Sequence, residues 1–406
     1  MMVKKRLIFI LLVPFMFLFG CDQTEPDFTL TMEQAVEDYN YMWDFFEENL
    51  PGFNMLERRL GIDVAEVREE GLNYLTAHGD SISIEYFLTF LTDHLLIFEH
   101  TLHIGAVNTD LAELLLLPSN SRWLFRDVIF DSAWTRQVYN HLTSLEEEGD
   151  SLEFDHFASA RPTFEVIDND TAVIEIGNFL MFAEDEEELY ELYRSFYAEA
   201  TSLGIENLIF DVSQNGGGND LHWQRHIVAP LTYETLRAEF YIFTRDSPTI
   251  VNYIHFLTGG SLQLYPIGGR DFDVAHPEDL EELGLYGVIW HEIEPDHDGI
   301  PAFEGNLFIL IDRPVFSSSD TFASFAKETE FATLVGRPGS GSGIGMQPLV
   351  LSLPESGLLI RMDAEYGVNA DGAASPEIGT LPHYDSGALT PLDRVLEIIE
   401  ERRLTE

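Results

Sequence analysis

Two stretches near the N-terminus repeat apolar residues at three- and four-residue steps, the pattern of amphipathic helices. The first begins where Thr31 and Gln34 are placed as a capping box and ends at Pro51-Gly52. The second covers residues 83–98, with its apolar side chains on one face. These patterns predict a helical cap domain over residues 31–103.

A different pattern begins near residue 164, where short apolar runs alternate with helical stretches. The predicted strands are residues 171–176, 207–212, 307–312 and 332–335, and the predicted helices are residues 184–203 and 319–329. Such alternation predicts α/β layers with parallel strands. A last helix should begin at Thr390-Pro391, with threonine as cap and proline at the first helical position. We therefore expect an α/β catalytic domain over residues 161–406, and residues 104–160 stay an unassigned connection.

The first residues have the pattern of an export signal. Three basic residues at positions 4–6 precede an uncharged, apolar run from Leu7 to Phe19 that is too short to span a bilayer comfortably. The run ends in Leu18-Phe19-Gly20-Cys21, which looks like a bacterial lipobox, and Cys21 is the only cysteine. We predict a lipoprotein signal peptide over residues 1–21, lipidation at Cys21 and a tether over residues 22–30. A cleaved signal with an incidental cysteine is the alternative.

Composition narrows the possible partners. The 406 residues include 22 Lys+Arg and 71 Asp+Glu, a net charge of −49, so a basic patch for nucleic acid is not expected. The apolar content of 45% is sufficient for a large core, which a chain without disulfides needs outside the cytoplasm. The acidic surface does not by itself identify a substrate.

Two motifs follow buried strands. In the first, the strand ending at Val212 leads through Asn215 into Gly216-Gly217-Gly218, where backbone N–H groups can approach a ligand and form part of an oxyanion hole. In the second, Ser317 stands between a strand and a helix, near the positive end of the helix dipole, which suits a nucleophile. Taken separately, the first is more typical of a flexible turn and the second of an ordinary helix cap.

Together the two motifs resemble the signature blocks of the tail-specific, or C-terminal-processing, protease superfamily. The blocks are residues 205–218 (IENLIFDVSQNGGG) and 307–343 (LFILIDRPVFSSSDTFASFAKETEFATLVGRPGSGSG). The resemblance implies Ser317 as nucleophile and a crotonase-like (ClpP-type) spiral α/β core beneath the N-terminal helical cap. No peptide-carboxylate-binding loop typical of a PDZ module is evident.

The resemblance also indicates a branch. Where the Ser–Lys members carry their lysine base this chain has Ser342, and Lys327 does not align with that base. The chain is more similar to the PDZ-less branch that includes the tricorn protease core, which implies His103 as base and Glu377 as acid. The same resemblance implies an oxyanion hole formed by N–H groups of Gly217 or Gly218 and of Ser318.

Rival residues stay open for each role. His100 is the rival base, Asp371 and Asp385 are rival acids, and Ser318 is the rival nucleophile. The glycine-rich residues 339–345 are interpreted as a turn beside the cleft rather than a dinucleotide loop, because no helix pattern follows.

No metal site is expected from the histidines of the C-terminal half. His291 and His297 are separated by Pro295, so no helix can place them on one face, and an acidic surface loop is the simpler interpretation.

The implied function is that of a membrane-anchored, extracytoplasmic serine peptidase that hydrolyses peptides or protein C-termini through an acyl-enzyme, without metal or cofactor. The alternatives are a catalytically inactive peptide-binding lipoprotein and an esterase-type acyl hydrolase. The inactive alternative is favoured by departures from the family pattern, namely Ser213, Asp320, Ser342 and His383. The natural substrate, its cleavage preference and the oligomeric state are not indicated by the sequence.

Overall fold

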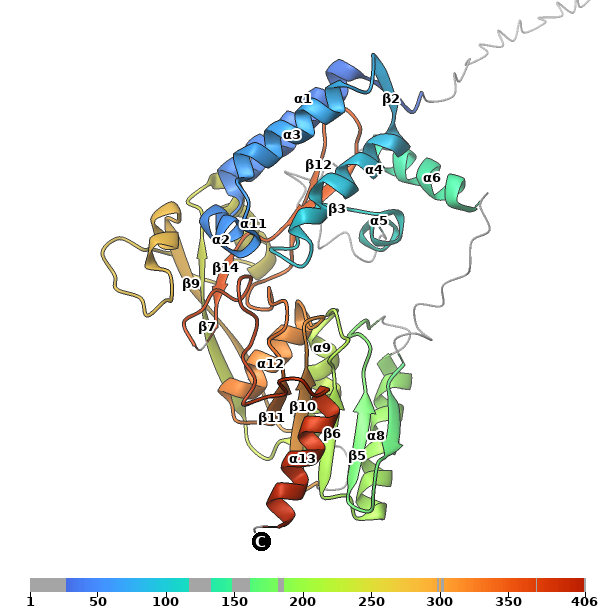
Figure 1. The fold of residues 1–406 in the computed structure, drawn as a ribbon, viewed down its shortest axis with the longest axis vertical. Coiled ribbons are helices and arrows are strands. Elements are labelled where there is room, and N and C mark those ends of the chain that lie inside the picture. The colour runs from blue at the N-terminus through green and yellow to red at the C-terminus, as the bar shows by residue number, and fades with distance from the viewer. Residues whose placement is uncertain are drawn as a thin grey trace, which may run out of the picture.

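The computed structural model describes residues 27–116, 133–147, 161–181, 186–297, 299–300, 303–369 and 371–404. These residues form a mixed α/β structure (Figure 1). The N-terminal helices α1, α3 and α4 lie at one end of the molecule, and the sheet that contains β5, β6 and β10 lies at the other. The predicted signal peptide, Cys21 and most of the tether lie outside the described residues, as does much of the connecting region.

The first predicted helix is confirmed with its cap. It is α1 (Met32–Asn49), and the Gln34 N–H donates to Thr31 Oγ1 at 3.2 Å while the Thr31 N–H donates to the Gln34 side chain at 3.0 Å. The second is α4 (Ile84–Leu95), which continues into the 3₁₀ turn η1 (Leu96–Phe98). The elements between them are β1 (Thr29–Thr31), α2 (Phe53–Leu60), α3 (Val64–Thr76) and β2 (Ser81–Ser83), and β1 pairs with β2.

The predicted strands form the centre of a six-stranded sheet within the described part of the chain. Its order is β15 (Tyr384–Asp385), β11 (Thr333–Gly336), β10 (Asn306–Ile311), β6 (Asn207–Asp211), β5 (Thr171–Glu175) and β4 (Thr163–Val166). Neighbouring strands are parallel except β4, which runs antiparallel to β5. Parallel pairing of β6 with β10 places both of their carboxyl ends at one edge, so the segments that follow them meet there.

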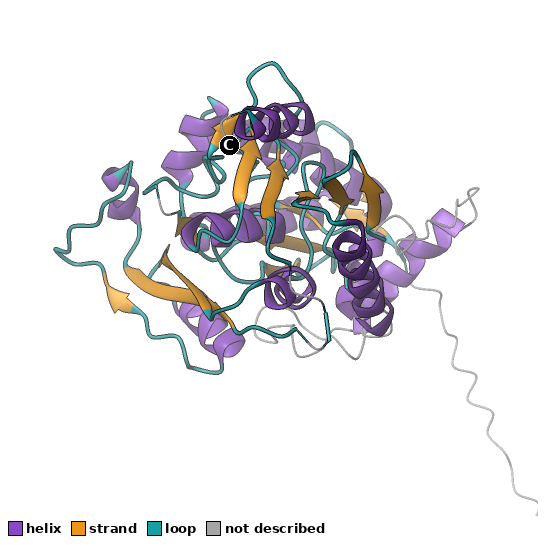
Figure 2. Ribbon diagram, turned by 90° about the horizontal axis from the view of Figure 1, so that it is seen from below, coloured by secondary structure: helices purple, strands orange, loops and turns teal. Residues whose placement is uncertain are grey.

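Helices cover both faces of this sheet, as Figure 2 shows. Alternate strand residues such as Phe210 and Ile309 pack against α8 (Glu186–Leu203) and α12 (Ser318–Glu328). The intervening residues, among them Ile209, pack against α13 (Pro391–Arg403), which begins at the predicted Thr390 cap. Burial on both faces explains the continuous apolar runs seen in these strands.

The structure adds two antiparallel sheets that the sequence did not predict. One has the order β14 (Tyr366–Val368), β7 (Leu236–Thr244), β9 (Leu285–Ile293), β8 (Tyr265–Pro266), and the other β12 (Leu349–Ser352), β13 (Leu359–Met362), β3 (Gly105–Ala106). Apolar residues of β12, β13 and β14 share one core with α1 and α4. The strands β7 and β9 contribute to that core through Phe243 and Tyr286, and to the core of α8 and α12 through residues such as Phe240 and Ile293. The N-terminal helices are therefore not built on a separate core, and the packing does not follow the predicted boundary at residue 161.

Shorter elements complete the described chain. They are α5 (Thr109–Leu116), α6 (Ala133–Glu147), α9 (Asp220–Trp223), the π-helical turn η3 (Gln224–Val228), α10 (Ala229–Leu231), α11 (Pro248–Thr258) and η4 (Pro277–Glu282). Within the described ranges, none of the helices has the length and apolar character needed to cross a membrane.

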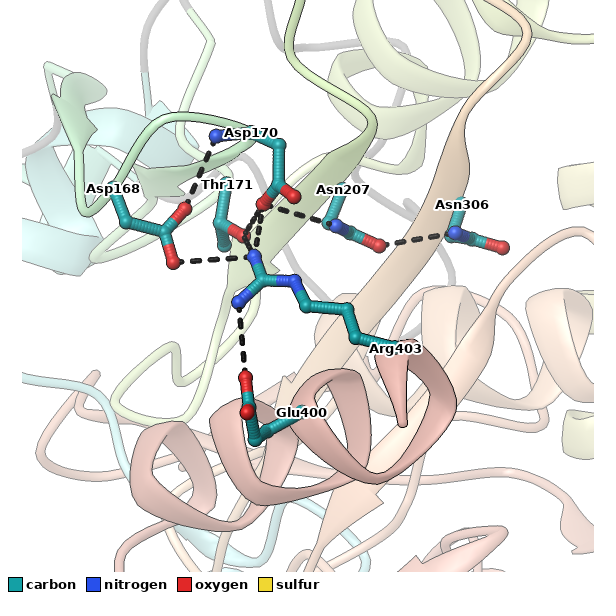
Figure 3. Close-up of polar contacts among 7 residues, drawn as sticks. All are labelled: Asp168, Asp170, Thr171, Asn207, Asn306, Glu400 and Arg403. Carbon is teal, nitrogen blue, oxygen red and sulfur yellow. Dashed lines mark hydrogen bonds and ion pairs between the residues drawn. The ribbon is translucent and has the colours of Figure 1, made fainter. Parts of the chain in front are cut away.

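A polar network fixes the end of α13 at the amino ends of the strands (Figure 3). Arg403 donates to Asp168 Oδ2 at 3.2 Å and also bonds Asp170 in the β4–β5 turn. Asn207 Nδ2 donates to Asp170 at 3.5 Å, and Asn306 Nδ2 donates to Asn207 Oδ1 at 3.0 Å. This network lies at the sheet edge opposite to the one where the glycine and serine motifs meet.

The core that α1 and α4 share with β12 and β13, here called the upper core, is bordered by a buried carboxylate of α1. Asp38 accepts backbone N–H groups of Glu355 at 2.8 Å and Ser356 at 2.7 Å, in the turn between β12 and β13. Burial raises the pKa of Asp38, and these hydrogen bonds oppose that rise. The carboxylate therefore joins the first helix to a turn more than three hundred residues later.

We expect Asp38→Ala to lower the free energy of unfolding by about 2–4 kcal/mol, because two buried N–H groups lose a charged acceptor. Urea denaturation measures the change. Asp44→Ala, which removes a carboxylate of the same helix that is 69% exposed, is the control and should cost under about 1 kcal/mol. Equal effects of the two substitutions would contradict this role of Asp38.

Candidate active site

Ser317 occupies a strained position at the junction between the strand β10 and the helix α12. Its backbone has φ 55° and ψ −129°, a conformation that L-residues rarely adopt and that is often found at functional sites. The Ser317 N–H donates to the carbonyl of Gly341 at 2.9 Å, and its own carbonyl accepts the Asp320 N–H. Its side chain is half-buried, whereas Ser318 and Ser319 are buried with hydroxyls that have no partner among the described residues. Ser317 is therefore the accessible hydroxyl of this turn.

The predicted glycine motif lies directly against Ser317. A Cβ placed on Gly217 would come within 2.8 Å of the Ser317 Cβ and 3.1 Å of the Ser318 nitrogen, and Gly217 has φ 108°. Gly218, at φ 143°, passes so close to the Phe179 backbone that a Cβ would lie 2.3 Å from its carbonyl carbon. Only glycine fits both positions, so the close approach predicted from the sequence has a steric basis.

The N–H groups of this region differ in availability. The Gly217 N–H donates to Asn215 Oδ1 at 2.8 Å. The backbone of Phe179 donates to the Gly217 carbonyl and accepts the Asn219 N–H, on either side of Gly218. For the N–H groups of Gly218 and Ser318, the described residues provide no acceptor. Of the three predicted donors, these two are free to bind an anionic oxygen.

His103 lies beside the nucleophile turn and is paired with a carboxylate. Its Nδ1 hydrogen-bonds Asp363 Oδ1 at 2.8 Å, and the two side chains are only 8% and 10% exposed. The imidazole ring lies 4.5 Å, centroid to centroid, from the ring of Phe316, the residue before Ser317. With Nδ1–H donated to the carboxylate, Nε2 carries the lone pair. No hydrogen bond between His103 and Ser317 is present in the described structure.

The turn that carries His103 is held from two sides. His100, Leu102 and His103 all have positive φ, between 48° and 56°. The Leu102 N–H donates to Ser342 Oγ at 3.1 Å, and its carbonyl accepts the Asp363 N–H at 2.7 Å. Ser342, where the resemblance to Ser–Lys proteases would place a lysine, thus supports the histidine turn.

The predicted acid, Glu377, makes no hydrogen bond to His103 among the described residues. Glu377 is not brought to His103, because both of its carboxylate oxygens bind Arg58 of α2, with Nε–Oε1 and Nη2–Oε2 distances of 2.6 Å. Asp363, which the sequence analysis did not consider, occupies the place beside His103 instead. A fully bonded arginine–carboxylate pair leaves Glu377 no free oxygen directed at the histidine.

The rival residues are engaged elsewhere or exposed. Asp371 bonds Lys327 Nζ at 2.6 Å, and Asp385 lies on the edge strand β15. His100 has a half-exposed side chain whose ring meets Phe316 edge-on at 5.4 Å. None of these side chains has the geometry that His103 and Asp363 have.

Two departures from the family pattern have structural roles. The buried Asp320 of α12 accepts the Thr380 N–H at 2.8 Å and the Ser375 hydroxyl at 3.0 Å, so it fixes α12 to the segment 375–380. Burial raises the pKa of Asp320 while these bonds lower it. His383 exchanges hydrogen bonds with the backbone of Leu334 on β11.

The glycine-rich residues 339–345 form a loop, as expected, and no helix follows them. His291 Nδ1 contacts Gln224 and His297 Nδ1 contacts the Pro230 carbonyl, so the two histidines do not converge. Across the described ranges, no cluster of three or more His, Cys, Asp and Glu side chains could hold a metal ion.

Asp363 belongs to a row of alternating charged residues, Arg361, Asp363 and Glu365, in an otherwise apolar run. Arg361 lies near the end of β13, and Asp363 and Glu365 lie in the short connection to β14. Burial, followed by the charge of Asp363, raises the pKa of Glu365 to about 8, and burial lowers the pKa of Arg361. This alternation of charged residues within an apolar run was visible in the sequence and could have indicated the partner of His103.

Comparison with known families identifies the class of protein. The model of Peptidase family S41 matches residues 170–386, more than half of the chain. The chain therefore belongs to peptidase family S41 and is a serine-type peptidase, as the resemblance to tail-specific proteases implied. The matched segment includes Ser317, Gly217, Gly218 and Asp363, whereas His103 precedes it.

Solved structures share the fold at low sequence identity. Mature CPAF has a TM-score of 0.54 at 14% identity, with 87% of this chain and 92% of that chain covered. CPAF complexed with lactacystin has a TM-score of 0.53 at 13% identity, covering 87% and 94%. A protein from Parabacteroides merdae ATCC 43184 has a TM-score of 0.51 at 14% identity, covering 91% and 96%. No curated protein sequence matches the chain.

The buried carboxyl of Glu365 should make stability depend on pH. Its folded pKa of about 8 exceeds the unfolded value of 4.5, so the folded state retains a proton that the unfolded state loses as pH rises between these values. Stability should therefore fall with rising pH by at most about 1.4 kcal/mol per pH unit from this group. Glu365→Gln should remove that component, so its stability gain over the wild type should grow from pH 5 to pH 8.

Chemical denaturation at several pH values measures this difference, with the exposed Glu328→Gln of α12 as control. A difference between Glu365→Gln and the wild type that stays constant from pH 5 to pH 8 would contradict the assignment.

Proposed function

We propose that the protein is a membrane-anchored, extracytoplasmic serine peptidase that cleaves peptides or protein C-termini with Ser317, His103 and Asp363. The observation that carries the proposal is the buried His103–Asp363 hydrogen bond of 2.8 Å beside the strained Ser317 turn. Membership of peptidase family S41 supports the reaction class.

In this mechanism, the Nε2 of His103 takes the proton of the Ser317 hydroxyl as its oxygen attacks the scissile carbonyl carbon. Asp363 holds Nδ1–H and stabilises the imidazolium that forms. The imidazolium then gives the proton to the departing amine, and the C–N bond breaks to leave an acyl-serine. Water, deprotonated by the same nitrogen, hydrolyses that ester and restores Ser317. Hydrogen bonds between a nucleophile and its base are often long in unliganded enzymes and shorten when substrate binds. The absence of a Ser317–His103 hydrogen bond is therefore compatible with catalysis.

The negative oxygen of the tetrahedral intermediate would bind the N–H groups of Gly218 and Ser318. Neither N–H has an acceptor among the described residues, while the N–H of Gly217 donates to Asn215. Ser318 is also the first residue of α12, so the positive end of the helix dipole adds to the stabilisation. Gly217 contributes to the site because it has no side chain, which allows Ser317 to lie directly against its backbone.

The anchoring and the fold type are part of the proposal. The basic start, the apolar run and Cys21 support export and attachment to the bacterial cell membrane through a lipid. The parallel order of β11, β10, β6 and β5, with helices on both faces, supports a crotonase-like spiral core. The net charge of −49 makes nucleic acid an unfavourable partner.

A non-catalytic binding protein is the second candidate, and an esterase-type hydrolase with the same residues is a third. The missing Ser317–His103 hydrogen bond and the replaced family residues favour the second. A binding protein should not react with a serine-directed probe, and comparison of peptide with ester turnover separates the third.

We expect a fluorophosphonate probe to label Ser317 in the protein that starts after Cys21, located by digestion and mass spectrometry. Ser317→Ala and His103→Ala should abolish labelling, because one removes the nucleophile and the other its base. An intact, folded protein that stays unlabelled would overturn the catalytic proposal and favour the binding protein.

The identity of the acid is tested separately. Asp363→Asn should reduce the labelling rate by about 10³–10⁴, since an amide favours the wrong imidazole tautomer. Glu377→Gln, the same chemical change at the acid that the sequence predicted, should retain the rate within about tenfold. The reverse ranking of the two variants would restore Glu377 as the acid.

A further inference from the structure

The end of α2 carries two consecutive arginines that reach the segments around Ser317. Arg58 binds Glu377 with two nitrogens and also binds the fully buried carboxylate of Asp279, at 3.1 Å from Nη1 and 2.8 Å from Nη2. Arg59 donates from Nη1 to the carbonyl of Ser340 at 3.2 Å and to the carbonyl of Pro376. The helix that carries both arginines belongs to the N-terminal segment, outside the α/β sheet.

The segments that receive these bonds, residues 339–343 and 375–380, pack directly on one another. A Cβ on Gly379 would lie 2.7 Å from the Gly339 carbonyl oxygen and 2.9 Å from the Gly341 nitrogen. The Ser342 N–H donates to the Ser375 carbonyl at 3.3 Å. Arg59 binds one carbonyl from each segment, so a single guanidinium holds the pair together.

The first segment touches both the nucleophile and the base. The Gly341 carbonyl accepts the Ser317 N–H at 2.9 Å, and the next residue, Ser342, accepts the Leu102 N–H at 3.1 Å, one residue before His103. A shift of this segment would therefore change the position of Ser317 relative to His103. Misplacement of reacting groups by about 1 Å can cost about 10²-fold in rate.

We infer that Arg58 and Arg59 are positioning residues for the peptidase reaction. Arg59 holds residues 340–342 directly, and Arg58 holds the adjoining segment 375–380 through Glu377, so that Ser317 and His103 meet. The inference rests on the proposed function and extends it, and it gives Glu377 a role through Arg58 rather than as the acid. Asp279 completes the assembly, since Tyr366 Oη also donates to its Oδ2 at 2.7 Å. The catalytic groups thus depend on an N-terminal helix that contacts neither of them through these bonds.

The experiment measures the reaction of a fluorophosphonate probe with Ser317 as a function of probe concentration, which separates the maximal rate kinact from the binding constant KI. The variants are Arg59→Gln and Arg58→Gln in the chain that starts after Cys21. The matched control is Arg68→Gln, which removes an arginine of α3 that pairs with Asp44 at 2.6 Å and Glu47 at 2.5 Å. Thermal unfolding of each variant is followed in parallel.

We expect Arg59→Gln to lower kinact by about tenfold to a hundredfold at a temperature where the variant is folded, with KI nearly unchanged. Arg58→Gln should act in the same direction, and Arg59→Lys, which keeps a charged donor, should recover part of the rate. Arg68→Gln should change Tm without changing kinact.

A wild-type kinact in folded Arg59→Gln and Arg58→Gln would overturn the inference while leaving the proposed function intact. Failure of the wild type to react would instead overturn the proposed function. If Arg59→Gln does not fold, the kinact of Arg59→Lys is the deciding measurement. A folded lysine variant with the wild-type kinact and an unchanged Tm would show that the guanidinium geometry is not needed, and would overturn the inference.

Discussion

The turn at Gly341 and Ser342 is the constraint on which the candidate site depends. The Gly341 carbonyl accepts the N–H of Ser317, and the Ser342 hydroxyl accepts the N–H of Leu102 in the turn that carries His103. Both residues have positive φ, at 84° and 54°, so the turn directs these two groups toward different neighbours within two residues. The nucleophile and the proposed base come from segments more than two hundred residues apart, and this turn is where they share a partner.

The rest of the fold brings the other groups to the same place. Ser317 follows β10 and the glycines 216–218 follow β6. These neighbouring strands are parallel, so their carboxyl ends lie at one sheet edge. His103 and Asp363 come from the upper core, where the N-terminal helices pack with β12 and β13. The site therefore lies where the two main cores meet. Changes in the packing of the N-terminal helices can therefore change the positions of Ser317 and His103. The bonds of Arg58 and Arg59 in α2 provide one such connection.

The sequence predicted those parts of the site that local pattern determines. The strands β5, β6 and β10 are buried on both faces, so their apolar runs were evident, and the serine and glycine motifs follow them directly. His103 was implied by family resemblance, and the structure places it beside Phe316. The carboxylate that bonds His103 was not predicted in the same way. Glu377 matches a motif, but its carboxylate is bound by Arg58, a long-range contact that no local pattern contains. The antiparallel sheets were missed for a related reason, since β7 and β9 pair across more than forty residues.

The central claim is that Ser317, His103 and Asp363 act together with the N–H groups of Gly218 and Ser318. A crystal structure of the protein after reaction with a small fluorophosphonate tests it most directly. The account predicts phosphorus bound to Ser317 Oγ, with one phosphoryl oxygen within hydrogen-bond distance of both N–H groups and His103 still bonded to Asp363. A phosphoryl oxygen bound elsewhere, or a histidine bonded to Glu377, would contradict the account.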